Sequence, residues 1–352
     1  KMNIIFFNTI ALGDYLVHSK IIKNLKVKLN CHITAVCSPY NSKIISKHTH
    51  IDKIIIYNKD WSLKEKINCL KEILKKKYYL SIVFDCQKFS MLCNFLIKSK
   101  YKRGPLMKKN KSFLFFNLNF YYPSKLLAFF LYDKHVIQTR YKYLKQPYHF
   151  PSTWIDLLKD FNHNVSKSDI YYFNPEKIEN NNKNLILNKL NIENYILIHF
   201  DYKWIDVLDI KKDLENCLIE LNRRTKNSII ITSYNNNFDY YKILEEKFNL
   251  YDVSSNKILK KNDLNIFIVK NPNVFLQERL ISSSRCNISC HSGIIVHSAG
   301  ANKAKLIDVL NENEIIIQKC WAPLFNYHVV KKSSNTSKIK ISEIFEKIAN
   351  LI

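Results

Sequence analysis

The segment NIIFFNTIALGD, residues 3–14, decides the fold that we expect for this chain. Its apolar run at 4–7 predicts a short buried strand, and Gly13 and Asp14 follow where a helix begins. A strand that passes through a glycine turn directly into a helix opens a βαβ unit, from which parallel α/β sheets are built.

Short apolar runs alternate with helical patterns as far as Asp85. We expect strands at residues 3–7, 32–36, 53–57 and 80–84, and helices at 14–24, 42–48 and 62–75. This alternation predicts an open, right-handed parallel sheet, which holds its ligands at the carboxyl ends of the strands.

The same rhythm restarts after a polar, asparagine-rich region. We expect strands at 195–199, 228–232, 266–269, 286–289 and 305–309, and helices at 211–224, 238–248, 274–284, 294–301 and 342–352. The fold is therefore expected to be α/β, with two Rossmann-like, doubly wound parallel-sheet domains that face each other across a cleft. We place these domains at residues 1–170 and 195–335, with a linker at 171–194 and a closing helix at 336–352.

The composition is that of a globular protein of 352 residues, 47% of them hydrophobic. The formal net charge of +25 is typical of proteins that bind nucleic acid, an anionic membrane face or a phosphorylated ligand. Because the lysines are dispersed along the chain, a solvated lysine-rich surface is an equal alternative. We find no signal-peptide pattern and no apolar run that could span a membrane, which predicts a cytoplasmic protein.

Two segments leave alternatives open. Nine cysteines without a CxxC pair predict buried thiols. Cys286 and Cys290 stand near His291, a spacing that also suggests a zinc site, but a strand explains the two cysteines better, so no metal is expected. Residues 113–132 are strongly apolar, interrupted by polar residues and flanked by lysines. They form either part of the core or a patch that enters a membrane surface.

Glycine occurs only four times, at Gly13, Gly104, Gly293 and Gly300. In so glycine-poor a chain we expect these residues in left-handed turns or where the backbone closely approaches a ligand. Gly293 stands in the segment CNISCHSGIIVHSAGA, residues 286–301, which again reads as strand, glycine turn and helix.

The start of that second helix has the chemistry of an anion site. Backbone N–H groups at a helix N-terminus, together with the helix dipole, suit a phosphate group. Ser292 adds a hydroxyl donor, and His297, one turn further on, faces either the core or the ligand. Lys203, at the end of the first strand of the second domain, reaches a phosphate or is one surface lysine among many.

Asp14 also has two interpretations. It either caps the first helix or provides a carboxylate that accepts a proton from a substrate hydroxyl. The sequence contains no P-loop, no GxGxxG, no GxSxG and no HExxH motif.

Taken in order, these motifs resemble glycosyltransferase family 9, the heptosyltransferase-like enzymes of the GT-B fold. The first strand of that family leads into a Gly–Asp turn, as at Gly13 and Asp14, and its fourth strand ends in Asp-x-Gln, as at Asp85 and Gln87. An Arg–Gly step, here Arg103–Gly104, then precedes a Tyr-Asp-x-x-His pattern. The stretch Tyr-Asp-Lys-His at 132–135 looks similar and is one residue shorter.

In the second domain the family has a lysine-containing loop and an Asp-Ser/Thr-Gly-x-x-His turn, which resemble Lys203 and residues 291–297. Three features depart from the pattern. His291 stands in place of the aspartate, one extra residue separates Gly293 from His297, and the loop around Lys203 lacks Pro–Gly.

The resemblance implies an inverting, metal-independent glycosyltransferase without a cofactor. It moves a heptose-like sugar from a nucleotide-diphosphate donor to lipopolysaccharide or another surface glycan. The roles it implies are Asp14 as catalytic base; Lys203, His291, Ser292, Gly293 and His297 as donor-binding residues; and Gly13, Asp85, Gln87 and Arg103 as acceptor-binding residues. Residues 1–170 are then the acceptor domain and 195–335 the nucleotide-sugar domain. The basic, aromatic region at 100–132 meets an anionic glycolipid at the inner membrane face, and no nucleic acid is bound.

Three alternatives stay open at this point. The chain is a GT-B transferase of another donor or acceptor, a homologue that has lost its activity, or a basic protein that binds nucleic acid or a membrane surface without catalysis. The last predicts clustered basic residues, whereas the lysines here are dispersed.

Overall fold

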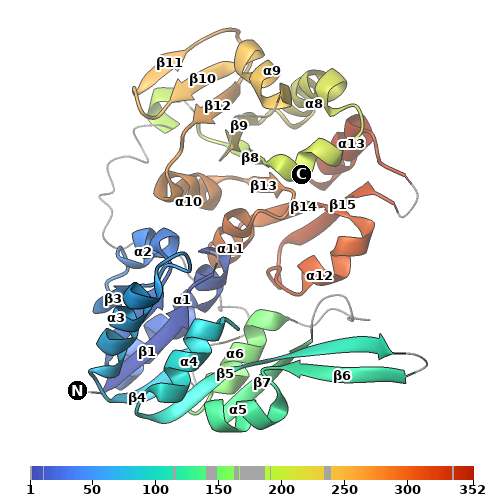
Figure 1. Ribbon diagram of the computed structural model, residues 1–352. Coiled ribbons are helices and arrows are strands. Elements are labelled where there is room, and N and C mark those ends of the chain that lie inside the picture. Colours follow the sequence, from blue (N-terminus) through green and yellow to red (C-terminus); the bar gives the residue numbers. More distant parts are fainter. Residues whose placement is uncertain are drawn as a thin grey trace. The chain divides into compact units, whose positions relative to one another are not determined.

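The structure, a computed structural model, describes residues 2–10, 12–113, 116–139, 149–161, 166, 187–190, 192–233, 239–334 and 337–352. The chain divides into two compact units, Lys1–Ile178 (unit 1) and Glu179–Ile352 (unit 2) (Figure 1). Most of the predicted linker at 171–194 lies outside the described residues.

Unit 1 is built on a mixed sheet with the strand order β3-β2-β1-β4-β5-β6, in which β7 also pairs with β5. The strands are β1 (Asn3–Asn8), β2 (His32–Cys37), β3 (Lys53–Ile56), β4 (Tyr78–Val83), β5 (Ser99–Phe113), β6 (Phe116–Tyr122) and β7 (Lys134–Thr139). The helices are α1 (Leu12–Leu29), α2 (Pro39–Ile45), α3 (Leu63–Leu74), α4 (Lys88–Leu96), α5 (Lys125–Leu131) and α6 (Phe150–Leu158). Every pairing except the antiparallel hairpin of β5 and β6 is parallel.

The four strands and three helices predicted for this unit are all present, and α1 and α2 are shifted at both ends. Helix α2 begins three residues before the predicted start, because Ser38 caps it by accepting a hydrogen bond from the Asn41 N–H and Pro39 fits the first helical position. Helix α1 runs past the predicted end to Leu29 and stops at Asn30, whose φ of 43° is left-handed. The part from β5 to α6 was not predicted.

Unit 2 has the strand order β11-β10-β12-β9-β8-β13-β14-β15 within its described residues. Its strands are β8 (Tyr195–Phe200), β9 (Ser228–Ser233), β10 (Asn249–Asp252), β11 (Lys257–Leu259), β12 (Ile266–Lys270), β13 (Cys286–Ser289), β14 (Lys305–Asn311) and β15 (Tyr327–Ser333). Its helices are α8 (Ile210–Thr225), α9 (Asp239–Lys247), α10 (Val274–Ser283), α11 (Gly293–Ala301), α12 (Ile315–Lys319) and α13 (Ile341–Leu351), with the 3-10 helices η3 (Tyr202–Asp206) and η4 (Glu312–Glu314). Among the strands that the structure describes in this unit, β11 pairs antiparallel with β10 and the other pairings are parallel. Strand β15 follows the segment that we expected to be the last strand. It was not predicted, because its two lysines interrupt the apolar pattern.

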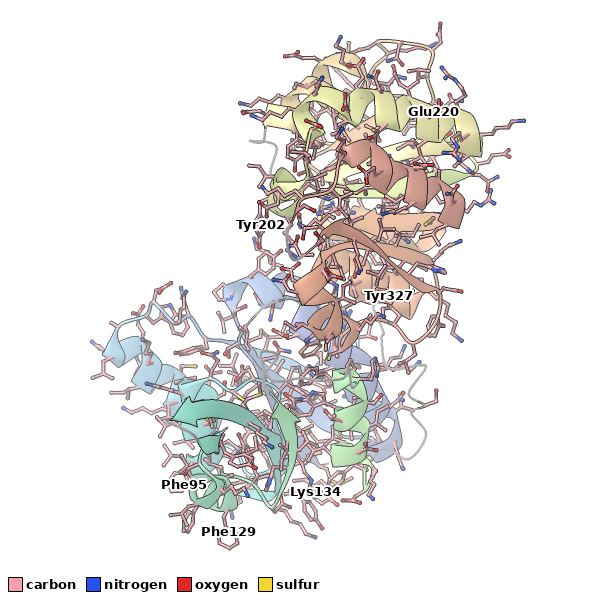
Figure 2. The ribbon with its side chains drawn as sticks, turned by 90° about the vertical axis from the view of Figure 1, so that its right-hand side faces the viewer. Phe95, Phe129, Lys134, Tyr202, Glu220 and Tyr327 are labelled. Atoms are coloured by element: carbon pink, nitrogen blue, oxygen red, sulfur yellow. The ribbon has the colours of Figure 1, made fainter. Side chains whose placement is uncertain are left out.

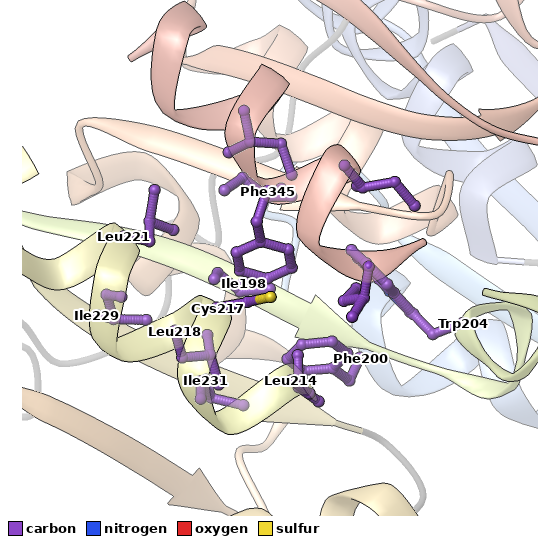
Figure 3. Packing of buried hydrophobic residues seen from close by; sticks show 14 of the residues in the cluster. Ile198, Phe200, Trp204, Leu214, Cys217, Leu218, Leu221, Ile229, Ile231 and Phe345 are labelled. Atoms are coloured by element: carbon purple, nitrogen blue, oxygen red, sulfur yellow. The ribbon is translucent and has the colours of Figure 1, made fainter. Parts of the chain in front are cut away.

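The predicted closing helix is α13, and it is part of unit 2. Figure 3 shows Phe345 of α13 inserted among Leu214, Leu218 and other side chains of α8 and the sheet. Leu208 fixes the start of this segment, because its N–H donates to the Ile339 carbonyl and its carbonyl accepts from the Ile341 N–H. Helix α13 therefore contributes to the unit 2 core through an apolar face.

Gly104 lies on β5 at a point where a side chain does not fit. A Cβ there would stand 2.1 Å from Cε1 of Tyr132, a buried ring with little room to move. We expect Gly104→Ala to lower the free energy of unfolding by about 1–3 kcal/mol through overpacking. Urea unfolding measures this, and Tyr132→Leu combined with Gly104→Ala should cost less than the sum of the single changes. Equal midpoints for Gly104→Ala and the unaltered protein would contradict this packing.

Two buried histidines make stability depend on pH. Burial lowers the pKa of His18 in unit 1 and of His199 in unit 2 from 6.5 to about 3. Below about pH 6.5 the unfolded chain therefore binds a proton that the folded unit does not, so each unit should lose about 1.4 kcal/mol of stability per pH unit as the pH falls. Urea unfolding between about pH 6.5 and about pH 5 measures this slope. His18→Gln should flatten it in unit 1, whereas the exposed His135→Gln should not; identical slopes would exclude His18 as the cause.

Candidate functional site

Three neighbouring parallel strands bring polar side chains together in unit 2. Strand β13 pairs with β8 on one side and β14 on the other, so that Ser289 lies between His199 and Asp308 in register. This is the carboxyl end of the strands, where open α/β sheets hold their ligands. Helix α11 begins four residues after Ser289, as the sequence predicts.

Asp308 is the centre of this group. Its carboxylate is fully buried and accepts hydrogen bonds from the backbone N–H of His291 (3.2 Å), the hydroxyl of Ser289 (3.3 Å) and the hydroxyl of Tyr327 (3.0 Å). Oδ2 of Asp308 also lies 2.6 Å from Nδ1 of His291. With Nδ1 donating to the carboxylate, Nε2 is the ring atom left for a ligand.

The left-handed backbone of this turn is at His291 and not at a glycine. His291 has a φ of 53°, whereas none of the four glycines has a positive φ. Gly293 is the first residue of α11 and Gly13 lies in the first turn of α1. The expectation that the glycines lie in left-handed turns was therefore wrong. His291 adopts the left-handed conformation instead, which usually costs energy for a residue with a Cβ atom, and its hydrogen bonds to Asp308 hold it there.

Two lysines approach the same turn. The Lys203 ammonium donates to the backbone carbonyl of His291 over 2.8 Å, and the ammonium of Lys332 donates to the carbonyl of Lys203. Lys332 is only 2% exposed. Burial raises the pKa of the nearby Asp201, and the Lys203 ammonium opposes that rise. Lys203 and His291 are thus joined by a direct bond although 88 residues separate them.

A cavity of about 200 Å³ opens beside this turn. Lys203, His291 and Lys332 line it together with Asn311 and Gln318. Its lining therefore carries two ammonium groups, an imidazole and two amides, together with the carboxylates of Asp206 and Glu314. The ammonium groups can recognise an anionic group of a ligand by charge and by hydrogen bonds, and the amides and carboxylates can bind hydroxyl groups. Figure 2 labels Tyr202, which also lines the cavity, and Tyr327, the partner of Asp308.

The start of α11 differs in detail from the expected anion cradle. Ser292 is the N-cap and its N–H already donates to the Ser289 hydroxyl over 3.3 Å. The N–H groups of Gly293, Ile294 and Ile295 remain to donate to a ligand, since Val296 is the first residue whose N–H bonds within the helix, to the Ser292 carbonyl. His297 is 6% exposed, which favours packing over contact with a ligand.

In unit 1, Asp14 lies in the first turn of α1 and is partly exposed. The positive end of the helix dipole stabilises its negative charge. Gly13 precedes it in the same turn. Because α1 begins at Leu12, Asp14 stands within the first turn and not at its N-cap. Asp14 as catalytic base stays a prediction.

Asp85 supports the connection from β1 to α1. Its carboxylate, 2% exposed, accepts from the Thr9 N–H (2.7 Å), the Thr9 hydroxyl (2.8 Å) and the Gln87 N–H (3.2 Å). Burial raises its pKa, and these hydrogen bonds oppose the rise. Asp85 therefore holds Thr9 in place directly after β1, and acceptor binding by Asp85 stays a prediction. Gln87 is exposed at the N-cap of α4.

Arg103 is buried among acidic and aromatic side chains. It is 4% exposed, forms an ion pair with Asp133 and lies 3.7 Å from Asp160. Its guanidinium also stacks near the rings of Tyr101 and Phe161. These contacts favour a structural role for Arg103 over acceptor binding.

All nine cysteines are free, and eight are buried. Burial raises the pKa of the Cys290 thiol well above its ordinary value, so the thiol stays protonated. Among the residues that the structure describes, no three His, Cys, Asp or Glu side chains gather as metal ligands would. Nor is any helix in the described ranges long and apolar enough to cross a membrane.

No protein-family model matches this sequence, and no curated protein matches it. Solved structures, in contrast, resemble the fold of this chain over its whole length. A family 9 glycosyltransferase of Veillonella parvula is similar with a TM-score of 0.67 and 12% identity, over 100% of this chain and 92% of that one. An E. coli heptosyltransferase solved with ADP is similar with a TM-score of 0.62 and 14% identity, over 100% of both chains.

The chain has the GT-B fold. A UDP-GlcNAc 2-epimerase of Methanocaldococcus jannaschii has a similar structure too, with a TM-score of 0.58 and 14% identity over 100% of this chain and 92% of that one. Since the GT-B fold is found in a transferase and in an epimerase, the reaction has to be argued from the site.

The sequence did not point to Asp308, Tyr327 or Lys332 as parts of this GT-B site. Asp308 offered one signal, because it is a lone charge within the apolar run LIDVL at 306–310. A charge in a buried strand needs partners, and the pairing of β14 with β13 supplies them. Tyr327 and Lys332 lie on β15, the strand that the pattern did not reveal.

Proposed function

We propose that this protein is a glycosyltransferase that binds a nucleotide-diphosphate sugar in unit 2. The observation that carries the proposal is the hydrogen bond from the Lys203 ammonium to the backbone carbonyl of His291. This turn lines a cavity to which Lys332 also contributes, and helix α11 begins two residues after His291. A diphosphate is the part of a nucleotide sugar that such a set of donors fits.

The site suits the leaving group of glycosyl transfer. As the bond between the anomeric carbon and the diphosphate oxygen breaks, negative charge grows on the diphosphate. The Gly293 N–H and the ammonium of Lys203 are fixed donors that stabilise this charge without reorganising. Because these donors are the chain's own cations and helix dipole, the proposed transfer is metal-independent and uses no cofactor.

His291 stands where the family pattern has an aspartate, and Asp308 lies directly behind it. The carboxylate keeps the ring oriented through Nδ1, so that Nε2 is presented to the donor as a hydrogen-bonding group. The position thus offers an imidazole supported by a carboxylate. We propose that this pair keeps the protein active and selects its donor sugar.

Asp14 of unit 1 is the proposed catalytic base. It takes the proton of an acceptor hydroxyl while the hydroxyl oxygen attacks the anomeric carbon and the diphosphate leaves, so the configuration at that carbon is inverted. The sugar is heptose-like. The acceptor is an anionic glycolipid of the lipopolysaccharide type or another surface glycan, reached at the inner face of the membrane from the cytoplasm.

A thermal-shift screen against ADP, GDP, UDP and CMP tests the donor site. At about 100 times its dissociation constant, one nucleotide should stabilise unit 2 by about 2.7 kcal/mol and raise its Tm by several degrees. Lys203→Met should remove most of that shift. Lys211→Met, a change of an exposed lysine on α8, should leave it intact. The absence of any shift at millimolar nucleotide, or a full shift in Lys203→Met, would overturn the assignment of the site.

A further inference from the structure

Helices α4 and α5 of unit 1 present an apolar surface to solvent. We call it the α4–α5 face. Its large side chains are all 44–77% exposed: Leu92 (49%), Phe95 (51%), Leu96 (44%), Leu126 (72%), Leu127 (46%), Phe129 (77%) and Phe130 (58%). Figure 2 labels Phe95 and Phe129, whose side chains point outward at the same end of unit 1. Exposed apolar side chains are ordinary when scattered, but a contiguous group of this size marks an interaction surface.

The two helices are firmly held by their opposite sides. The side chain of Asn94 on α4 donates to the carbonyl of Leu131 on α5 over 2.8 Å and itself accepts from the hydroxyl of Ser81 on β4. Ala128 and Leu131 belong to the unit 1 core. The exposed residues therefore stand on rigid helices, and their exposure is a property of the folded unit.

The sequence of this segment carries charge of one sign. Between Asp85 and Asp133 it contains no Asp or Glu but eight lysines and one arginine, in a chain that has 30 acidic residues in all. The arginine, Arg103, is paired with Asp133. Four of the lysines are exposed and lie at the ends of the two helices or beside them: Lys88, Lys98, Lys100 and Lys125. Although lysines are dispersed along the whole chain, this segment therefore presents exposed lysines beside the apolar side chains.

We infer that the α4–α5 face is a docking surface for an anionic lipid bilayer. This inference deepens the membrane contact of the proposed function by assigning it to named residues. Phenylalanine and leucine side chains enter the boundary between headgroups and acyl chains, while lysines extend to the lipid phosphates. A protein partner fits less well, because lysine is depleted in protein–protein interfaces whereas here it provides nearly all the charge.

Vesicle sedimentation tests the surface. The protein should bind vesicles of mixed phosphatidylcholine and phosphatidylglycerol, bind pure phosphatidylcholine at least about tenfold more weakly, and lose binding as salt is raised. The double variant Phe129→Ser/Phe130→Ser should reduce binding to the mixed vesicles at least about tenfold. Val27→Ser removes an apolar side chain that is 73% exposed on α1 and should bind like the unaltered protein.

Two further measurements separate the possible outcomes. If the double variant binds the mixed vesicles as well as the unaltered protein does, the inference is wrong. If light scattering shows a dimer that the double variant breaks while vesicle binding is unchanged, the face joins two copies of the chain and the inference is also wrong. The nucleotide thermal shift of the double variant should equal that of the unaltered protein, so a failed donor site and a failed docking surface are told apart.

Discussion

Asp14→Asn is expected to lower the rate of sugar transfer by about 100- to 10,000-fold while leaving nucleotide binding unchanged. The amide has nearly the shape of the carboxylate and stays in the first turn of α1, but it cannot take a proton from the acceptor hydroxyl. Because the donor residues lie in unit 2, the thermal shift caused by the nucleoside diphosphate should be preserved. Release of nucleoside diphosphate from the nucleotide sugar in the presence of acceptor measures the transfer rate.

A matched control is Asp213→Asn, which removes a carboxylate from the first turn of α8. This variant should lose a similar small amount of stability from the helix end and keep full transfer activity. If Asp14→Asn turns over at the unaltered rate, Asp14 serves only the helix and another group is the base.

Asp308→Asn should weaken binding of the nucleoside diphosphate by about 10- to 100-fold, which corresponds to about 1.4–2.7 kcal/mol. The carboxylate serves His291, Ser289 and Tyr327, whereas an amide has one acceptor oxygen and turns two N–H donors toward groups that also donate. The His291 turn, to which Lys203 is bound, would lose its support. Titration calorimetry measures the affinity, and thermal unfolding shows whether the variant is folded.

Tyr327→Phe provides the milder comparison, since it removes one of the hydrogen bonds to Asp308 and leaves both contacts with His291. It should reduce affinity less than fivefold, in keeping with the loss of about 1 kcal/mol. Unaltered affinity in a well-folded Asp308→Asn variant would show that the His291 turn does not depend on this carboxylate.

The repeating elements of both units were predictable because each one is encoded locally. Strands such as β1 and β8 are short apolar runs, and α8 and α10 show apolar residues at helical spacing, so the parallel-sheet core follows from pattern alone. The hairpin of β5 and β6 was not predicted, since the lysines and the Gly104–Pro105 pair in β5 obscure its alternation. Strand β15 was missed for the same physical reason.

The site was only partly predictable, because it is assembled by pairing between distant segments. The sequence placed Lys203, His291 and Gly293 at strand ends, and the structure brings Lys203 and His291 into direct contact. The sequence did not indicate that Asp308 lies beside Ser289, because that contact depends on the register of β13 and β14. Arg103 and Asp85 were identified by matching motifs. Such a match did not reveal that both side chains are buried and bound to other residues of unit 1, Arg103 to Asp133 and Asp85 to Thr9.

The most direct test is proton NMR of a reaction that contains the protein, the nucleotide sugar whose nucleotide gives the largest thermal shift, truncated lipopolysaccharide as acceptor, and a metal chelator. We predict equal amounts of nucleoside diphosphate and glycosylated acceptor, with the new glycosidic bond in the configuration opposite to that of the donor. Retained configuration, loss of turnover caused by the chelator, or a nucleotide sugar that is epimerised with its diphosphate bond intact would contradict the account.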